Sequence, residues 1–179
     1  MKNVSGPVLI GMRGTGKSTI APRTAARLGF SVIDADAEIE RRSGMTIREM
    51  FEKHGEEYFR RIEREVLTDL LSRKDTVLSL GGGAVLHPAV REILKTRATV
   101  WLHAPMKVLS RRVSGSNRPS LSGKPIHEEL SAIFEARRAL YEECASLKLD
   151  TSTCSPDKAA EKVAVFFREW VGKNEGFQN

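Results

Sequence analysis

Residues 11 to 18 read Gly-Met-Arg-Gly-Thr-Gly-Lys-Ser, directly after the apolar run Val8–Ile10 and directly before a segment with the pattern of a helix. Glycines at this spacing let backbone N–H groups turn inward around the phosphates of a nucleotide. Lys17 brings positive charge to the outer phosphates, Ser18 offers a hydroxyl to Mg²⁺, and the helix presents its N-terminal amides to the same anion. The stretch therefore predicts a phosphate-binding P-loop; a glycine-rich turn without nucleotide is the alternative.

Length and composition indicate one ordinary domain. The chain has 179 residues, 40% of them hydrophobic, which is enough for a core without disulfides or metals. The first ten residues run straight into the P-loop, and no apolar run approaches the ~20 residues of a membrane span, so we expect neither a signal peptide nor a membrane partner. The two cysteines and four histidines lack the spacing of a zinc site or a disulfide framework. These features predict a cytoplasmic protein.

The positive charge has two interpretations. A formal net charge of +6 would suit a nucleic-acid binder, but a protein that holds a nucleotide and an acidic substrate also needs basic residues. Aromatic residues make up only 6% of the chain and are not interleaved with a basic strand, as a single-strand binder requires. We therefore expect a small-molecule substrate, no nucleic-acid partner and a monomer. Many arginines lie near the segments expected at the active site, namely Arg13, Arg60, Arg61, Arg111, Arg112, Arg118, Arg137 and Arg138.

Short apolar segments rich in β-branched residues recur along the chain. The stretches between them are long enough for helices, which predicts βαβ crossovers and a mainly parallel sheet covered by helices on both faces, a three-layer α/β/α fold. In such sheets ligands bind at the carboxyl ends of the strands. The predicted strands are Val8–Ile10, Ser31–Ile33, Val77–Leu80, Thr99–Leu102 and, more weakly, Ser146–Leu149.

Unusual residues follow the second and third predicted strands. Asp34 and Asp36 are two residues apart, so on an extended segment both carboxylates would face the crevice of the P-loop. Asp36 is also a candidate N-cap for a helix over Ala37–Arg42, and the two roles are compatible. Gly81-Gly82-Gly83 contributes little packing and costs chain entropy, which suggests that a ligand approaches the backbone there. A flexible turn is the alternative.

Two further segments carry arginines. A helix predicted over about Glu56–Ser72 places Arg60 and Glu63 one turn apart, so the carboxylate can hold the guanidinium for a substrate anion, although such pairs are more often solvated surface pairs. Residues 114–124 are rich in Gly, Ser and Pro around Arg118. This composition favours a lid whose arginine reaches the phosphates on closing, with a passive connector as the alternative. Arg137 lies on a helix predicted over Glu128–Ala145.

Phosphoryl transfer needs positioned phosphates, Mg²⁺, an oriented acceptor hydroxyl and positive charge on the transferred group, and the chain offers a candidate for each. It has no Asn-Lys-x-Asp segment for reading guanine and is short for a motor or a helicase. A small-molecule kinase is therefore favoured.

Six elements resemble the shikimate kinase family, in order and over nearly the whole chain: GMRGTGKS at 11–18, IDAD at 33–36, FRRIE at 59–63, SLGGGA at 79–84, NRP at 117–119 and RRALYEE at 137–143. The resemblance implies ATP-dependent phosphorylation of the 3-hydroxyl of shikimate, giving shikimate 3-phosphate and ADP on the pathway to chorismate and the aromatic amino acids. It implies a nucleoside-monophosphate-kinase type of fold, with a five-stranded parallel sheet and a mobile lid. The single kinase domain would span 1–179, with its P-loop at 11–18, a substrate-binding region at about 34–63 and a lid at about 114–124.

The resemblance also implies roles for individual residues. Lys17, Asp36 and Arg118 would be catalytic; Ser18 would bind Mg²⁺ directly and Asp34 through water. Asp36 would contact the acceptor hydroxyl, as base or, because an aspartate of ordinary pKa is a weak base at neutral pH, as the group that orients it. Arg60 and Arg137 would hold the shikimate carboxylate. The full nucleotide set is Gly14, Thr15, Gly16, Lys17, Ser18, Thr19, Arg112 and Arg118, and the full shikimate set is Asp36, Phe51, Phe59, Arg60, Gly81, Gly82, Gly83 and Arg137.

Three features depart from the family pattern: Ser120 stands where an apolar lid residue is frequent, Pro22 lies within the helix after the P-loop and is expected to kink or restrict it, and the segment between Arg112 and Arg118 is short. Two alternatives stay open. A kinase of another small polyol or acid, such as gluconate, would keep the P-loop without needing both Arg60 and Arg137. A catalytically silent nucleotide-binding module usually loses the lysine or the acidic pair, and both are present here.

Overall fold

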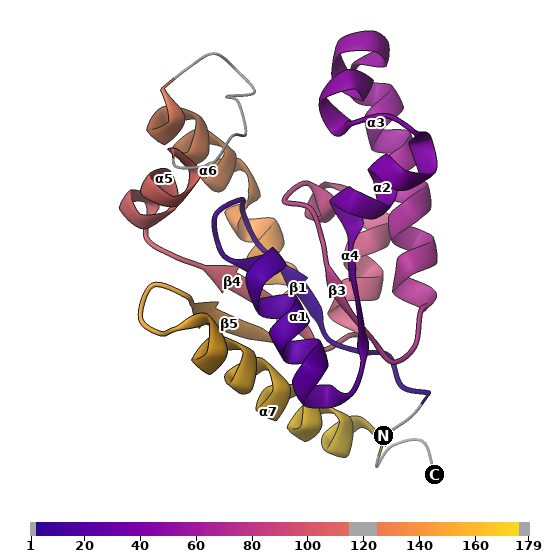
Figure 1. Ribbon diagram of the computed structural model, residues 1–179, viewed down its shortest axis with the longest axis vertical. Helices are drawn as coiled ribbons and strands as arrows, with labels where there is room; N and C mark the ends of the chain where they lie inside the picture. The colour runs from indigo at the N-terminus through magenta and orange to yellow at the C-terminus, as the bar shows by residue number, and fades with distance from the viewer. Residues whose placement is uncertain (1–2, 115–124, 176–179) are drawn as a thin grey trace.

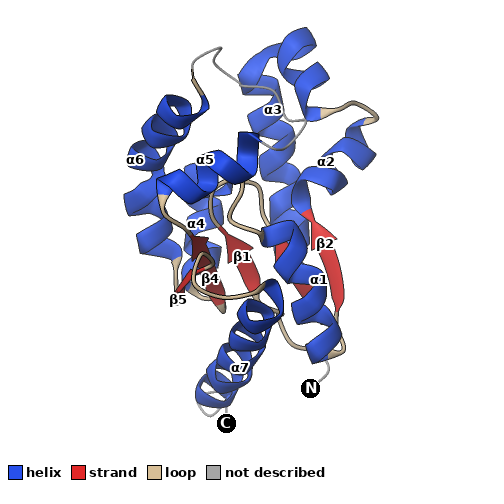
Figure 2. Cartoon of the chain, turned by 60° about the vertical axis from the view of Figure 1, so that its left-hand side comes forward, coloured by secondary structure: helices blue, strands red, loops and turns tan. Residues whose placement is uncertain are grey.

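Five parallel strands form one sheet at the centre of the molecule (Figures 1 and 2). The computed structural model describes residues 3–114 and 125–175. The strand order is β2-β3-β1-β4-β5, so β1, which leads into the P-loop, lies in the middle of the sheet. The predicted strands are confirmed to within one residue at each end. Their bounds are Val8–Ile10 (β1), Ser31–Asp34 (β2), Thr76–Ser79 (β3), Thr99–His103 (β4) and Leu147–Asp150 (β5).

Helices cover both faces of the sheet, as the three-layer prediction requires (Figure 2). Side chains alternate along the strands: Leu9 packs with α1 and α7, whereas Val8 and Ile10 pack with α3, α4 and α6. The central strands β1, β3 and β4 are therefore largely buried, whereas the edge strands β2 and β5 are partly exposed. The helices are Lys17–Leu28 (α1), Ala35–Ser43 (α2), Ile47–Ser72 (α3), Pro88–Lys95 (α4), Met106–Ser114 (α5), Ile126–Cys144 (α6) and Pro156–Glu175 (α7), with a 3₁₀ turn at Ala84–Leu86 (η1).

Helix α1 ends at a glycine. Gly29 caps it in a left-handed conformation, with φ of 69°, and donates its N–H to the carbonyl of Ala25. The helix continues through Pro22 to Leu28, so this proline does not end it.

Helix α3 is longer than predicted. It begins at Ile47, where Thr46 and Glu49 form a capping box, and it bends at Gly55, whose φ of 80° and ψ of 175° are not helical. Sequence reasoning located only the part after this glycine. The first part holds Met50 in the core and brings Phe51 beside Phe59. No helix within 3–114 and 125–175 is long and apolar enough to cross a membrane.

Candidate active site

The P-loop connects β1 to α1 at the carboxyl edge of the sheet. Gly11, Gly14 and Gly16 all have positive φ, of 138°, 82° and 94°, a conformation that favours glycine. The ammonium of Lys17 donates to the carbonyls of Gly11, at 2.7 Å, and of Met12, at 2.9 Å, so the lysine lies across the loop. The loop thus has the left-handed turns that aim amide groups toward an anion.

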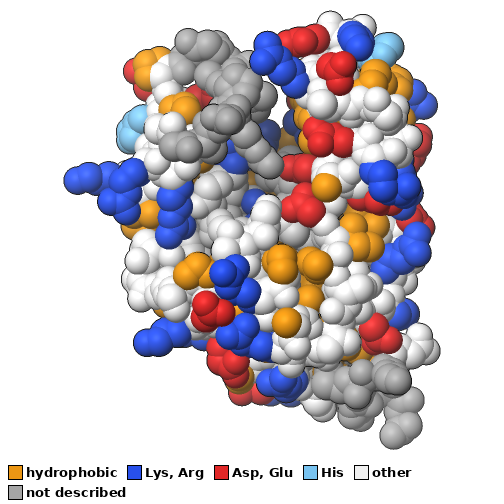
Figure 3. All heavy atoms as spheres, in the orientation of Figure 1, with side chains coloured by type: hydrophobic (Ala, Val, Ile, Leu, Met, Phe, Trp, Pro, Cys, Tyr) orange, Lys and Arg blue, Asp and Glu red, His pale blue; other side chains and the backbone are white. Residues whose placement is uncertain are grey.

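A cavity of about 300 Å³ opens beside this loop. It lies on the face shown in Figure 3, which is hollowed between the α5–α6 part and the α2–α3 part of the molecule. Most of the predicted nucleotide and metal residues line it. Thr15 does not, because its side chain is buried and its hydroxyl donates to the carbonyl of Met12 at 2.7 Å. The lining residues are Arg13, Gly14, Gly16, Lys17, Ser18, Thr19, Asp34, Asp36, Ser79, Leu80, Gly82, Arg112 and Val113.

Ser18 and Asp34 meet at the floor of this cavity. The hydroxyl of Ser18 donates to Oδ2 of Asp34 at 3.1 Å, and Ser79 donates to the same oxygen at 2.9 Å. A hydroxyl and a carboxylate this close fit Mg²⁺, which takes few protein ligands and completes its shell with phosphate oxygens and water. The described residues contain no cluster of three or more His, Cys, Asp or Glu that could hold another metal.

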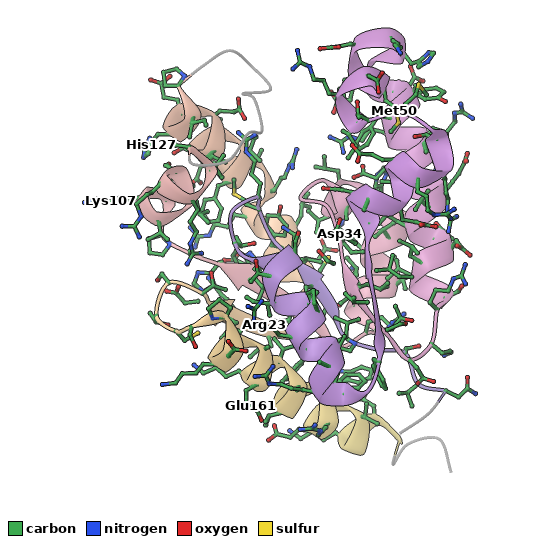
Figure 4. The ribbon with its side chains drawn as sticks, viewed as in Figure 1. Arg23, Asp34, Met50, Lys107, His127 and Glu161 are labelled. Carbon is green, nitrogen blue, oxygen red and sulfur yellow. The ribbon has the colours of Figure 1, made fainter. Side chains whose placement is uncertain are left out.

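The roles of the two aspartates differ from the sequence prediction. Asp34, not Asp36, is the N-cap of α2: its Oδ1 accepts from the backbone N–H groups of Asp36, at 3.1 Å, and Ala37, at 3.4 Å. Figure 4 shows Asp34 where β2 passes into this helix. Asp36 lies in the first helical turn rather than on an extended segment. Both carboxylates still line the cavity, because the helix begins there and not because strand residues alternate.

The glycine triplet after β3 explains how the predicted substrate residues come together. A β-carbon at Gly81 would collide with the carboxylate of Asp36, and one at Gly83 would collide with the guanidinium of Arg60. A β-carbon at Gly82 would lie 3.7 Å from Nη1 of Arg137 and 3.5 Å from the hydroxyl of Tyr141. Side chains from α2, α3 and α6 therefore converge on three consecutive glycines, so the triplet is not merely a flexible turn.

Arg60 and Glu63 form the ion pair predicted from their spacing, with Nη1 2.6 Å from Oε2. Glu63 is buried and also bonds at 2.9 Å to Nε2 of His87, so the pair is not a solvated one. Burial alone would raise the pKa of Glu63, but the hydrogen bond from His87 and the charge of Arg60 together lower it below its ordinary value. Arg60 also lies over the ring of Phe59, which packs against Phe51 with ring centroids 4.8 Å apart.

Two further residues organise this region. Tyr141 donates to the carbonyl of Gly82 at 2.7 Å and stacks on Trp101. Burial raises the pKa of Tyr141 to about 12, against the opposing effect of Arg137, so its hydroxyl stays a donor. Arg112 bonds to the carbonyl of Gly14 at 3.2 Å and to the carbonyl of Thr151 at 2.9 Å. It therefore joins the P-loop to the loop that follows β5.

Comparison with known proteins assigns the family. The family model for shikimate kinase matches residues 13–168. The chain belongs to the shikimate kinase family. The shikimate kinase of Mycobacterium ulcerans is 45% identical over 150 residues, which are 83% of this chain and 82% of that protein. The bifunctional shikimate kinase/3-dehydroquinate synthase of Thermotoga maritima is 47% identical over 145 residues, which are 80% of this chain but only 28% of that longer protein.

Solved structures agree with this family. The shikimate kinase of Acinetobacter baumannii in complex with shikimate has a TM-score of 0.84 and 34% identity, covering 98% of this chain and 96% of that one. The shikimate kinase of Aquifex aeolicus has a TM-score of 0.78 and 29% identity over 90% of this chain and 95% of that one. A gluconokinase from Sinorhizobium meliloti, with a TM-score of 0.61 and 15% identity, shares the fold alone.

For this member of the shikimate kinase family, sequence reasoning missed some residues. His87 carried no signal, because its partner Glu63 is 24 residues away. Arg13 of the P-loop forms an ion pair with the buried Glu129 of α6, and only the basic charge of Arg13 hinted at a partner. Arg118 and nearly all of the predicted lid at 114–124 lie outside the described residues.

Proposed function

We propose that this chain is a shikimate kinase, which transfers the γ-phosphoryl group of ATP to the 3-hydroxyl of shikimate and releases shikimate 3-phosphate and ADP. The reaction belongs to the pathway to chorismate and the aromatic amino acids. One observation carries the proposal beyond family membership: Asp36, Arg60 and Arg137 converge on Gly81–Gly83, adjoining the cavity lined by the P-loop. A carboxylate for a hydroxyl and two guanidinium groups for a carboxylate fit one acidic polyol beside a nucleotide.

The P-loop side of the site binds the nucleotide. Gly14, Gly16 and Thr19 present backbone amides to the phosphates, and Lys17 exchanges the loop carbonyls for the β- and γ-phosphate oxygens. Ser18 and Asp34 would hold Mg²⁺, which would neutralise charge on the phosphates. Arg112 supports the adenine side through its bonds to the loop after β5. Arg118 of the lid supplies further positive charge.

The glycine side of the site binds shikimate. Arg60 and Arg137 bind the carboxylate, and Phe51 and Phe59 form an apolar wall beside Arg60. This arrangement turns the opposite side of the ring toward Asp36 and the phosphates. Asp36 accepts a hydrogen bond from the 3-hydroxyl and orients its oxygen for attack on the γ-phosphorus, taking the proton as the new bond forms. Because phosphoryl transfer demands little covalent chemistry, positioning and charge provide most of the rate.

The proposal extends to the oligomeric state, the partners and the cellular location of the enzyme. We also propose that the enzyme acts as a monomer. In this proposal Lys17, Arg60 and Arg137 bind anionic small molecules, and the activity requires neither nucleic acid nor a membrane. A cytoplasmic location supplies ATP and the pathway intermediates.

The test is ADP release from ATP and Mg²⁺ in a coupled assay, with shikimate, gluconate, AMP or no acceptor. Stimulation by shikimate alone supports the proposal. Stimulation by gluconate or AMP would keep the nucleotide site and refute the substrate assignment. ADP release that does not depend on any acceptor would indicate ATP hydrolysis and refute the kinase assignment. Absence of release under all conditions would point to a catalytically silent nucleotide-binding module.

A further inference from the structure

Glu63 receives two donors at one oxygen. Arg60, from the same helix, and His87, from the start of α4, both bond to its Oε2, at 2.6 Å and 2.9 Å. The side chain of Glu63 is only 3% exposed, and that of His87 only 11%. A carboxylate this deeply buried keeps its charge only if donors surround it. The three side chains therefore form one buried chain of contacts that ends at the proposed substrate ligand.

The chemistry of the pair fixes how His87 takes part. Glu63 is ionised, since its pKa lies below its ordinary value despite burial, and an ionised carboxylate only accepts hydrogen bonds. The Nε2 atom of His87 must therefore be protonated, and its N–H donates a hydrogen bond to Oε2 of Glu63. The imidazole is a fixed donor that keeps Oε2 in place from a second element of structure.

His87 is itself held by its backbone. It is the N-cap of α4, with Pro88 at the first helical position, its N–H bonds to the carbonyl of Ala84 at 3.3 Å, and its carbonyl accepts from Arg91 at 3.0 Å. Thus His87, at one end of this series of side-chain contacts, is fixed to η1 and α4, which directly follow the glycine triplet. The other end, Arg60, lies against Gly83 of that triplet.

Other support for Arg60 is weaker. Its second carboxylate partner, Glu56, is 3.1 Å away but 65% exposed, and exposed ion pairs hold side chains poorly. Glu56 and Glu63 both belong to α3, so neither fixes Arg60 to another element on its own. His87 supplies that link.

We propose that His87 is a positioning residue for the acceptor substrate, which acts through Glu63 to hold the guanidinium of Arg60 where the substrate carboxylate binds. The inference rests on the proposed function, because it takes Arg60 as a carboxylate ligand. In this view His87 does not touch the substrate, yet its removal weakens binding of the acceptor and leaves binding of ATP unchanged.

A matched control is available on the same side of α3. A cavity of about 530 Å³ there is lined by His87, Arg60 and Arg64, among others. The side chain of Arg64 has no hydrogen bond or ion pair among the described residues. Arg64→Gln therefore changes charge and shape at the same cavity without touching Glu63.

The experiment measures KM for shikimate, KM for ATP and kcat in His87→Leu, His87→Gln, Arg60→Gln and Arg64→Gln, with thermal unfolding to verify folding. We expect His87→Leu to raise KM for shikimate about three- to tenfold, from partial loss of a charged hydrogen bond, with kcat within about twofold. His87→Gln, whose amide reaches the position of Nε2, should restore most of the affinity. Arg64→Gln should leave all three constants unchanged.

A double variant tests the route of the effect. In an Arg60→Gln background, His87→Leu should raise KM for shikimate no further, because residues that act through one contact are not additive. An equal increase in both backgrounds would overturn the inference. So would a raised KM in Arg60→Gln with an unchanged KM in His87→Leu, and that result would leave the proposed function standing.

Two other outcomes decide the remaining cases. An unchanged KM for shikimate in Arg60→Gln would remove Arg60 from the carboxylate site and overturn the inference, whereas absence of shikimate-dependent turnover in the wild-type protein would refute the proposed function. If His87→Leu does not fold, the wild-type protein still provides a test. The ¹⁵N resonance of His87 Nε2, assigned by its loss in His87→Gln, should shift when shikimate is added, and an unchanged resonance would overturn the inference.

Discussion

Substitution of Gly83 by alanine separates binding of shikimate from folding. Gly83 has φ of −89° and ψ of −9°, which alanine adopts without strain. The three atoms nearest the new β-carbon all belong to the guanidinium of Arg60, with which it would collide. Because that group ends a long side chain, it can move aside, and the backbone need not. The variant should therefore fold normally and hold Arg60 in the wrong place.

The size of each effect follows from these contacts. Glycine to alanine at a compatible backbone position stabilises a fold by about 0.4–1 kcal/mol. Moving Nη1 of Arg60 also disturbs its bond to the buried Glu63, and loss of a donor to a buried group costs about 1–3 kcal/mol, so the unfolding free energy should fall by less than about 3 kcal/mol. A hydrogen bond to a charged group contributes about 1.5–3 kcal/mol, so losing the Arg60 contact should raise KM for shikimate about 10- to 100-fold. The contact is made in ground and transition states alike, so kcat should change little.

Two related variants make the comparison specific. In Gly81→Ala the β-carbon collides with Asp36 instead, so kcat should fall, on the order of 100-fold for a displacement near 1 Å. Gly172→Ala, in α7, meets no atom within 4 Å and should alter neither constant. Initial rates of ADP release at saturating ATP, with shikimate varied, measure all three. A folded Gly83→Ala enzyme with an unchanged KM for shikimate would refute the placement of Arg60 in the carboxylate site.

The other predictions concern Asp36, Arg137 and Glu63. Asp36→Asn should nearly abolish turnover and leave ATP binding, measured by calorimetry, largely intact; a fully active variant would refute its role. Arg137→Ala should raise KM for shikimate far more than KM for ATP, and an unchanged shikimate value would remove it from the site. Although burial alone would raise it, the pKa of Glu63 lies below 4.5 in the fold, so its stabilisation is complete above pH 4.5 and is lost as pH falls through the lower folded value. Glu63→Gln should flatten that part of the pH dependence of unfolding, and an unchanged slope in denaturant titrations would contradict it.

The sequence predicted the layers of the fold because the signals there are local. The central strands are buried and are rich in apolar residues, and Gly29 marks the end of α1 by its left-handed cap. The P-loop is similarly local, since eight consecutive residues contain its glycines, its lysine and its hydroxyl. Features of this kind need no knowledge of distant contacts.

Boundaries that depend on tertiary packing were predicted less well. The first part of α3 escaped notice because Gly55 interrupts the helical pattern, yet packing of Met50 in the core stabilises it. Alternation along an extended segment was the wrong reason for placing Asp34 and Asp36 together. Capping by Asp34 starts α2 two residues earlier than predicted, and the turn that follows aims Asp36 at Gly81.

The glycine triplet shows why site geometry is harder to predict than site composition. In the sequence, Gly81-Gly82-Gly83 is a run of three identical residues, which suggests that a ligand approaches the backbone and leaves a flexible turn as the alternative. In the fold, each glycine leaves room for a different side chain. Gly81 lies against Asp36 of α2, Gly82 against Tyr141 and Arg137 of α6, and Gly83 against Arg60 of α3. None of these partners is nearer than 20 residues along the chain, so no local pattern encodes the match. If the absence of a side chain at Gly83 sets the position of Arg60, and His87 fixes Arg60 from behind, then affinity for the acceptor depends on η1 and α4 as much as on the arginines themselves.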